Sequence, residues 1–212
     1  MIDWFACRVE NTFFRRPCDI ADAEKTYFPN QRKINNIKLI LSQWVRLEPL
    51  DISKHSKDLF QSNTMDRNGS NWAYLPYGPF ATLEAYETWL SKAALTPDLN
   101  FFAIIKRADN KAVGLASYLR INPQDGSIEV GHINYSPLLQ KTREGTEAMY
   151  RMMKWAFESG YRRYEWKCNA LNTKSRYAAQ RLGLAWLVLR GGVSANVDQQ
   201  GTQSQYRLVC GH

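Results

Sequence analysis

The chain has 212 residues, of which 44% are hydrophobic and 13% aromatic, and its formal net charge is +8. This length predicts one substantial domain rather than two, and the apolar share is enough for a packed core. The sequence has no run of about 18 apolar residues and no basic segment followed by an apolar stretch at its start, so we expect a cytoplasmic protein with no membrane partner.

The first 42 residues show no sustained helical or strand periodicity, and Pro17 and Pro29 interrupt them. We therefore expect an N-terminal extension at 1–42, a folded domain at 43–193 and a divergent tail at 194–212. The predicted elements of the domain, in chain order, are a strand at 43–48, a helix at 52–62, an aromatic loop at 71–80, a helix between Thr82 and Pro97, strands at 101–106, 112–119 and 127–135, a helix at 146–159, a strand at 163–168 and a helix at 173–182. The helical crossover between the last two strands implies that they are parallel, and the order of elements predicts an α+β fold.

The cysteines and histidines are too scattered to predict a metal site. They are Cys7, Cys18, Cys168, Cys210, His55, His132 and His212. No two cysteines have the close spacing of a zinc or redox motif, so we expect reduced thiols and no bound metal.

The basic charge is concentrated in the second half of the chain. Between Lys141 and Arg181 there are ten basic and four acidic residues. Such an excess suits nucleic acid or a phosphate-bearing cofactor, and it is equally typical of a solvated helix face.

A strand-to-helix connection at 136–148 is the candidate anion site. The start of a helix presents free backbone N–H groups at the positive end of the helix dipole. Lys141 and Arg143 would add charge there, and Thr142 and Thr146 would add hydroxyl groups. On these residues alone, an ordinary capped helix start explains the segment better than a pyrophosphate site does.

Four segments together resemble the GNAT acyltransferase superfamily, in particular the group related to ribosomal-protein N-terminal acetyltransferases. The segments are Gly131–Pro137, Gln140–Ala148, Asn169–Arg176 and Arg181–Gly183. The resemblance spans 44–183, about two-thirds of the chain. It implies a mixed, mostly antiparallel sheet with helices on both faces. It also implies an N-acetyltransferase that moves an acetyl group from acetyl-CoA, as co-substrate, to a protein N-terminus or a small-molecule amine by direct attack, without a metal.

The resemblance also assigns cofactor-binding residues. The segment Gln140–Gly145 matches the coenzyme A loop, of the form Gln/Arg-x-x-Gly-x-Gly/Ala, except that Arg143 stands where glycine is usual. That side chain would limit close backbone approach, or its guanidinium would meet a phosphate. The implied cofactor-binding residues are Tyr135, Gln140, Lys141, Thr142, Arg143, Glu144, Gly145, Thr146, Asn172 and Ser175. The strands ending near Tyr135 and Cys168 would splay to hold the pantetheine arm, with backbone donors polarising the thioester carbonyl.

Catalysis by this route needs a proton acceptor, because an alkyl ammonium must lose a proton before it attacks. Glu165 matches a glutamate that serves as base in relatives, and Glu129 lies on the neighbouring predicted strand. Each is equally well explained as the partner of a nearby arginine. Ser175 resembles the family serine that protonates the leaving thiolate. Asn172 matches the residue that holds the pantetheine or the acceptor, a role compatible with capping the last helix.

The aromatic loop occupies the place where this superfamily binds its acceptor. Its candidate substrate-binding residues are Trp72, Tyr74, Tyr77 and Phe80. Aromatic faces attract a cation by about 0.5 to 2 kcal/mol per contact. The same side chains could instead seal the edge of the core, so the acceptor cannot be identified from them.

The sequence departs from the family pattern after Gly183. The polar stretch at 194–205 has linker composition, and only Tyr206–Cys210 could supply a further short strand. If that strand is absent, the sheet keeps an open edge, which would offer a surface for pairing with a second copy. We expect a better preserved cofactor half than acceptor half. Two alternatives to an active enzyme follow, a catalytically impaired GNAT-fold binding protein and a basic nucleic-acid-binding protein. Charge without a recognition motif is weak evidence for the latter.

Overall fold

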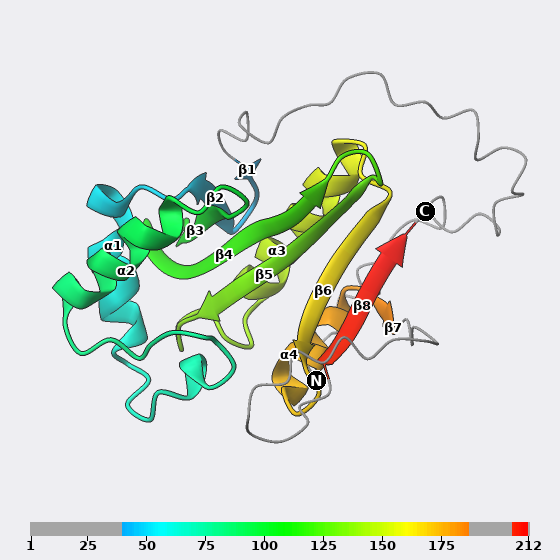
Figure 1. Cartoon of the computed structure of the whole chain (residues 1–212). Coiled ribbons are helices and arrows are strands. Elements are labelled where there is room, and N and C mark those ends of the chain that lie inside the picture. The colour runs from blue at the N-terminus through cyan, green and yellow to red at the C-terminus, as the bar shows by residue number, and fades with distance from the viewer. Residues whose placement is uncertain (1–39, 187–204, 212) are drawn as a thin grey trace, which may run out of the picture. The chain divides into compact units, whose positions relative to one another are not determined.

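The computed structural model describes residues 40–186 and 205–211, which all fall within one of the two compact units of the chain, residues 32–212. These residues form an eight-stranded sheet in the order β1-β2-β3-β4-β5-β6-β8-β7 (Figure 1). The strands are β1 Ile40–Leu41, β2 Val45–Pro49, β3 Asn100–Lys106, β4 Lys111–Asn122, β5 Ser127–Tyr135, β6 Arg163–Asn169, β7 Ala185–Trp186 and β8 Gln205–Gly211. Every neighbouring pair is antiparallel except β5 and β6, so the predicted α+β class and mostly antiparallel sheet are confirmed.

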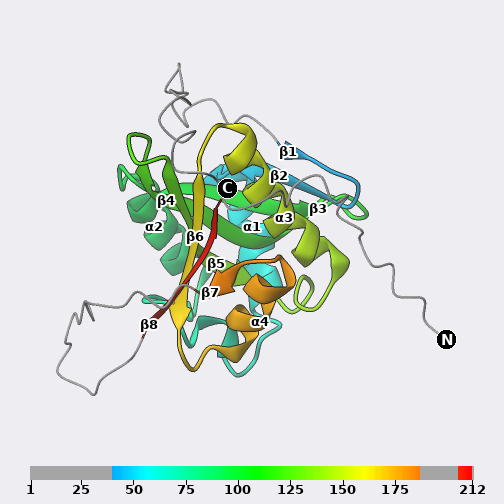
Figure 2. The same ribbon diagram turned by 90° about the vertical axis from the view of Figure 1, so that its right-hand side faces the viewer.

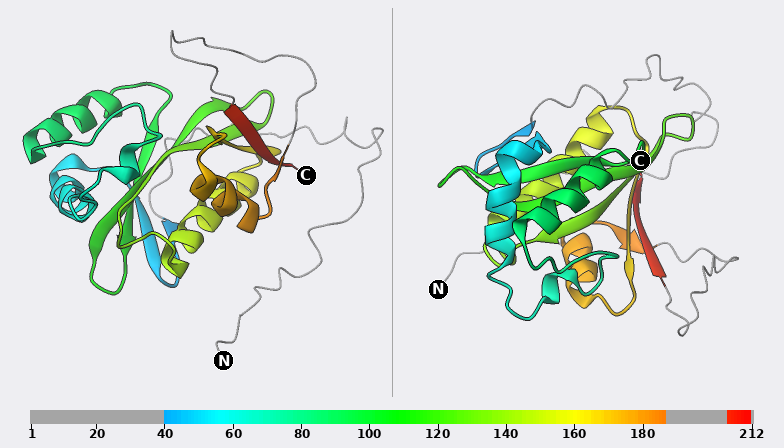
Figure 3. Two further views of the ribbon diagram at one scale, coloured as in Figure 1. Left: turned by 90° about the horizontal axis from the view of Figure 1, so that it is seen from below. Right: turned by 60° about the vertical axis from the view of Figure 1, so that its left-hand side comes forward.

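Four α-helices cover the two faces of the sheet. They are α1 Ile52–Asn63, α2 Leu83–Ala94, α3 Arg143–Glu158 and α4 Thr173–Arg181, and a short 3₁₀ helix, η2, spans Ser70–Trp72. The left view of Figure 3 shows α1 and α2 on one side of the sheet and α3 and α4 on the other. Successive side chains of β3 point to opposite faces of the sheet and so contribute to both hydrophobic cores. Phe102 and Ile104 pack in the cluster that includes residues of α3. Phe101 and Ile105 pack in the cluster that includes residues of α1 and α2.

The helix starts follow from capping residues in the sequence. Thr82 accepts a hydrogen bond from the N–H of Ala85, and Asn172 caps α4 in the same way. Helix α3 begins at Arg143, three residues before the expected start, because Thr142 is the residue that caps it. This difference places the second half of the predicted coenzyme A loop inside the first turn of the helix.

The C-terminal part of the sheet contains the terminal strand whose absence would have left an open edge. Strand β8 pairs with β6 along its whole length, from Arg163↔Gly211 to Asn169↔Gln205 (Figure 2). Polar, linker-like composition before a strand does not exclude such pairing, because the entropic cost of closing a loop rises only slowly with its length. The expected tail at 194–212 therefore contributes a strand at 205–211, whereas 187–204 and the expected extension before Ile40 lie outside the described residues.

Candidate active site

Strands β5 and β6 separate midway along their length. Their parallel pairing runs from Ser127↔Arg163 to Val130↔Trp166 and then ends. Strand β5 continues to Tyr135 and β6 to Asn169, with β6 still paired to β8 on its other side (Figure 1). The splay implied by the family resemblance is thus present, and the separated strand ends leave their facing backbone groups unpaired with each other.

A bulge in β5 lies at this point of separation. Ser117 is opposite Gly131 and Leu115 is opposite Asn134, so β5 contains one extra residue between these pairs. His132 has a positive φ of 50°, which is uncommon for a residue other than glycine. The bulge is therefore centred on His132.

The turn before α3 leaves several backbone N–H groups free. The Thr142 hydroxyl donates to the Leu139 carbonyl at 2.7 Å and accepts from the Gly145 N–H at 3.1 Å. Within the described part of the chain, the N–H groups of 141–144 have no hydrogen-bond acceptor. Four donors without an acceptor at the positive end of a 16-residue helix are the arrangement that an anion requires.

Buried contacts hold this turn in place. The Tyr135 hydroxyl donates to the Gly145 carbonyl at 2.7 Å, and the Gln140 amide donates to the Tyr135 carbonyl at 2.8 Å and to Asn71. A Cβ at Gly145 would lie 2.6 Å from the Leu139 carbonyl oxygen, so the glycine is required by packing of the turn. The hydrogen bonds of Tyr135 and Gln140 therefore stabilise the conformation of the predicted cofactor loop.

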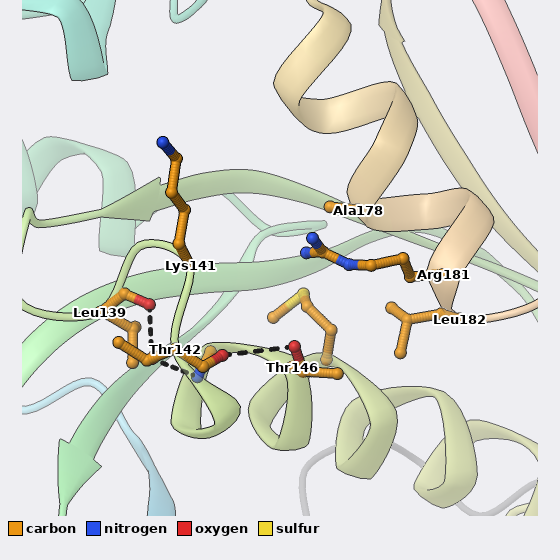
Figure 4. A pocket seen from close by; sticks show the side chains of 9 residues that line it. Leu139, Lys141, Thr142, Thr146, Ala178, Arg181 and Leu182 are labelled. Carbon is orange, nitrogen blue, oxygen red and sulfur yellow. Dashed lines mark hydrogen bonds between the residues drawn. The ribbon is translucent and has the colours of Figure 1, made fainter. Parts of the chain in front are cut away.

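A pocket lies between the start of α3 and the end of α4 (Figure 4). It is lined by Leu139, Lys141, Thr142, Gly145, Thr146, Met149, Ala178, Arg181 and Leu182. Arg181 reaches over the pocket from α4, and Lys141 projects from the turn on the other side. Neither cation has a carboxylate within salt-bridge distance among the described residues. The family resemblance assigns Arg181 no cofactor-binding role, although Arg181 lies in one of the segments that resemble the family.

Arg143 and Glu144 are placed differently from the pocket residues. The Arg143 guanidinium lies 4.8 Å from the centre of the Trp44 ring, and its Nε is 3.6 Å from a Glu144 carboxylate oxygen. As the first residue of α3, Arg143 is not among the described residues with positive φ, so its side chain causes no strain. Neither residue lines the pocket. The Thr146 hydroxyl donates to the Thr142 carbonyl at 3.3 Å.

The two candidate bases are buried in one ion-pair network. Glu129 and Glu165 are opposite each other on β5 and β6 and are only 3% and 4% exposed. The Lys167 ammonium nitrogen lies 2.5 Å from a Glu129 carboxylate oxygen and 3.6 Å from one of Glu165. A guanidinium nitrogen of Arg120 lies 2.5 Å from a Glu129 oxygen. The Nε of Arg163 lies 2.8 Å from a Glu165 oxygen. The alternative of structural ion pairs therefore accounts for both carboxylates.

Ser175 lies beside β6 at the start of α4. Its backbone N–H donates to the Asn172 side chain at 3.1 Å, and its hydroxyl oxygen accepts from the Trp166 indole at 2.9 Å. Its hydroxyl also hydrogen-bonds the half-buried Cys168 thiol, which lowers the thiol pKa, while burial raises that pKa by more. Since the indole donates to the oxygen of Ser175, the hydroxyl proton is left to donate, and the Cys168 sulfur is its acceptor in this structure.

The aromatic loop is divided between the core and the surface. Trp72 is buried and makes edge-to-face contacts with Phe80 and Tyr77, with ring centroids 5.5 and 6.1 Å apart. Tyr74 is 48% exposed, and its hydroxyl donates to the Leu171 carbonyl in the connection between β6 and α4 at 3.1 Å. Most of the loop thus seals the core, and Tyr74 connects the loop to the β6–α4 side.

Comparison with known proteins gives the family of this fold and site. Residues 45–185 match the family model of the acetyltransferase (GNAT) domain. The chain belongs to the GNAT acetyltransferase family. No curated protein matches it, but a solved GNAT relative from Chromobacterium violaceum, called a probable acetyltransferase, is 34% identical, with a TM-score of 0.72 over 82% of this chain and 85% of that chain. A GCN5-related N-acetyltransferase from Brucella melitensis is also 34% identical, with a TM-score of 0.74 over 82% of this chain and 78% of that chain.

The GNAT fold also extends to more distant solved structures. RimL, a ribosomal L7/L12 α-N-protein acetyltransferase solved in complex with coenzyme A, is 18% identical, with a TM-score of 0.66 over 82% of this chain and 98% of that chain. At this identity the likeness shows a shared fold only. Among the described residues, no group of potential metal ligands comes together, and no helix is both long and apolar enough to cross a membrane.

Proposed function

We propose that this GNAT protein transfers the acetyl group of acetyl-CoA to an amine, either a protein N-terminus or a small-molecule amine, by direct attack of the amine on the thioester. The observation that carries this proposal is the set of backbone N–H groups at 141–144, which have no acceptor among the described residues. They lie beside the pocket that Lys141 and Arg181 line. Three kinds of donor converge on one small volume, which suits a pyrophosphate.

The separated strands suit the remainder of the co-substrate. An extended pantetheine arm carries amide groups that need hydrogen-bond partners, and the unpaired ends of β5 and β6 supply them. Ser175 stands at the β6 side of this separation with a proton to donate to the departing thiolate. RimL, which shares the fold, is solved in complex with coenzyme A, and this supports coenzyme A as the ligand.

Binding without catalysis is a second candidate. It is favoured because both predicted bases, Glu129 and Glu165, form ion pairs with cationic side chains. Such a protein would bind acetyl-CoA and transfer nothing.

Product analysis separates the two candidates. The protein would be incubated with acetyl-CoA and a panel of N-terminal peptides and small amines, and acetylated products would be detected by mass spectrometry. The proposal expects amides formed in proportion to enzyme concentration. Calorimetric binding of acetyl-CoA with no product across the panel would support the binding protein, and the lack of both would contradict the two candidates together.

Replacing Ser175 with alanine is expected to lower kcat by about 10- to 100-fold while acetyl-CoA affinity changes by less than about threefold, because donation of a proton to the thiolate contributes in the transition state. Steady-state kinetics and calorimetry would measure the two quantities. Thr173→Ala, an exposed change on the same turn of α4, is the control and should leave both near wild type. Equal losses of kcat and affinity in Ser175→Ala would show a binding role instead.

A further inference from the structure

His132 occupies an unusual position in this site. It is the residue at the centre of the β5 bulge and lies two positions beyond Val130, the last residue of β5 that pairs with β6. The bulge places it on the face of the sheet covered by the aromatic loop and α2, since its ring contacts Tyr77 and Phe101. A half-buried imidazole therefore stands between the predicted acceptor loop and the point where the strands separate.

The His132 ring is held by aromatic contacts. It stacks on Tyr77 with centroids 5.6 Å apart and an interplanar angle of 10°, and it meets Phe101 edge to face at 5.5 Å. Its Nδ1 lies 3.1 Å from the Tyr77 hydroxyl oxygen. Tyr77 in turn packs against Trp89 of α2, with centroids 4.0 Å apart and the ring planes tilted by 32°. One ring nitrogen is thus fixed by a hydrogen bond, which leaves Nε2 for other partners.

We propose that His132 is the base that accepts the ammonium proton of the acceptor and that Tyr77 positions its imidazole; this rests on the proposed acetyl transfer. In this arrangement Nδ1–H donates to the Tyr77 oxygen, and Nε2 takes one proton from the ammonium and passes it to solvent. The neutral amine then forms the new C–N bond at the thioester carbonyl as the C–S bond breaks. The second proton of the nitrogen reaches the thiolate through the Ser175 hydroxyl, so the products are the amide and the coenzyme A thiol.

The electrostatic surroundings agree with this role. Burial lowers the pKa of His132, and the charge of Arg120 on β4 lowers it further, so the ring is neutral near pH 7 and can accept a proton. Burial raises the pKa of Tyr77, which therefore stays a phenol. Phe101 on β3 carries no charge, and Glu129, the acidic residue nearest on β5, is paired with Arg120 and Lys167.

The positive φ of His132 allows a test that does not unfold the protein. Asparagine and glycine adopt this backbone conformation readily, which partly offsets the loss of the ring contacts with Tyr77 and Phe101, so His132→Asn and His132→Gly should still fold. At pH 7 both are expected to lower kcat by about 100-fold, in the usual range for general-base catalysis, with acetyl-CoA affinity changed by less than about twofold. Added imidazole should restore part of the activity of His132→Gly.

Two further readouts distinguish a base from a structural residue. In the wild type, kcat should fall as pH decreases through a pKa below 6.5, because protonated imidazole cannot accept a proton, and this limb should be lost in His132→Asn. Tyr77→Phe keeps the stacking and should lower kcat by about 3- to 10-fold, because it only loosens the ring orientation.

The outcomes separate this inference from the proposed function. A wild-type protein that acetylates amines while His132→Asn retains its kcat and its acidic limb would overturn the inference alone. A wild-type protein with no transfer would overturn both. Nuclear magnetic resonance of the imidazole nitrogens gives an independent check, since a neutral ring protonated at Nε2 rather than Nδ1 would also contradict the assignment.

Discussion

Reversing the charges of Lys141 and Arg181 together is expected to weaken acetyl-CoA binding by about 100-fold or more. Each cation lines the pocket at the start of α3, and neither is paired with a carboxylate in the described part of the chain. A charge-assisted hydrogen bond contributes about 1.5 to 3 kcal/mol, so the loss of two corresponds to at least about 3 kcal/mol. Isothermal titration calorimetry of the Lys141→Glu, Arg181→Glu double variant measures the effect directly.

The matched control for this double variant is Lys57→Glu with Lys92→Glu, which makes the same change of net charge on exposed positions of α1 and α2. It should alter affinity by no more than about threefold. Equal losses in both variants would mean that only overall charge matters, as expected for a non-specific basic surface, and the dependence on salt would then be steep.

Replacing Glu147 with alanine is expected to destabilise the fold by about 3 to 5 kcal/mol. This carboxylate is 9% exposed on α3 and accepts from the backbone N–H groups of Gln43, Trp44 and Val45 at 2.9 to 3.2 Å. Its removal leaves three donors without this acceptor, of which that of Val45 is buried, and a hydrogen bond to a charged group contributes about 1.5 to 3 kcal/mol. Urea unfolding followed by circular dichroism would measure the change.

Glu158→Ala serves as the control on the same helix, because Glu158 is exposed and its ion pair among the described residues is an i,i+4 pair with Lys154. That change should cost less than about 0.5 kcal/mol. Similar destabilisation by the two variants would show that the contacts of Glu147 with the start of β2 do not tie α3 to the sheet. Since α3 carries the proposed cofactor site, Glu147→Ala should also weaken acetyl-CoA binding at temperatures near its unfolding transition.

Most of the fold could be predicted because local signals agree with the tertiary structure. Thr82 and Asn172 cap the helices as expected, and the β-rich run at 127–135 forms a strand over the residues predicted. The parallel neighbours β5 and β6 followed from the length of the connection between them. These features depend on residues close in sequence, which is why composition and spacing were sufficient.

The candidate site was predicted less completely, because its geometry depends on contacts between distant segments. The stacking of Arg143 on Trp44 turns the guanidinium away from the pocket, and no local pattern indicates it. Arg181 reaches the start of α3 only through the packing of α4. The bulge that presents His132 is a change of register against β4, so it cannot be recognised from β5 alone.

Hydrogen exchange at the backbone amides of 141–144 shows whether the turn before α3 holds the pyrophosphate, since these N–H groups have no acceptor among the described residues and should exchange rapidly without ligand. If they hold the pyrophosphate, saturating acetyl-CoA should slow their exchange by at least about 10-fold, while amides of the exposed 108–110 turn remain unchanged. Calorimetric binding of acetyl-CoA without protection at 141–144 would contradict the account, because the co-substrate would then be held elsewhere.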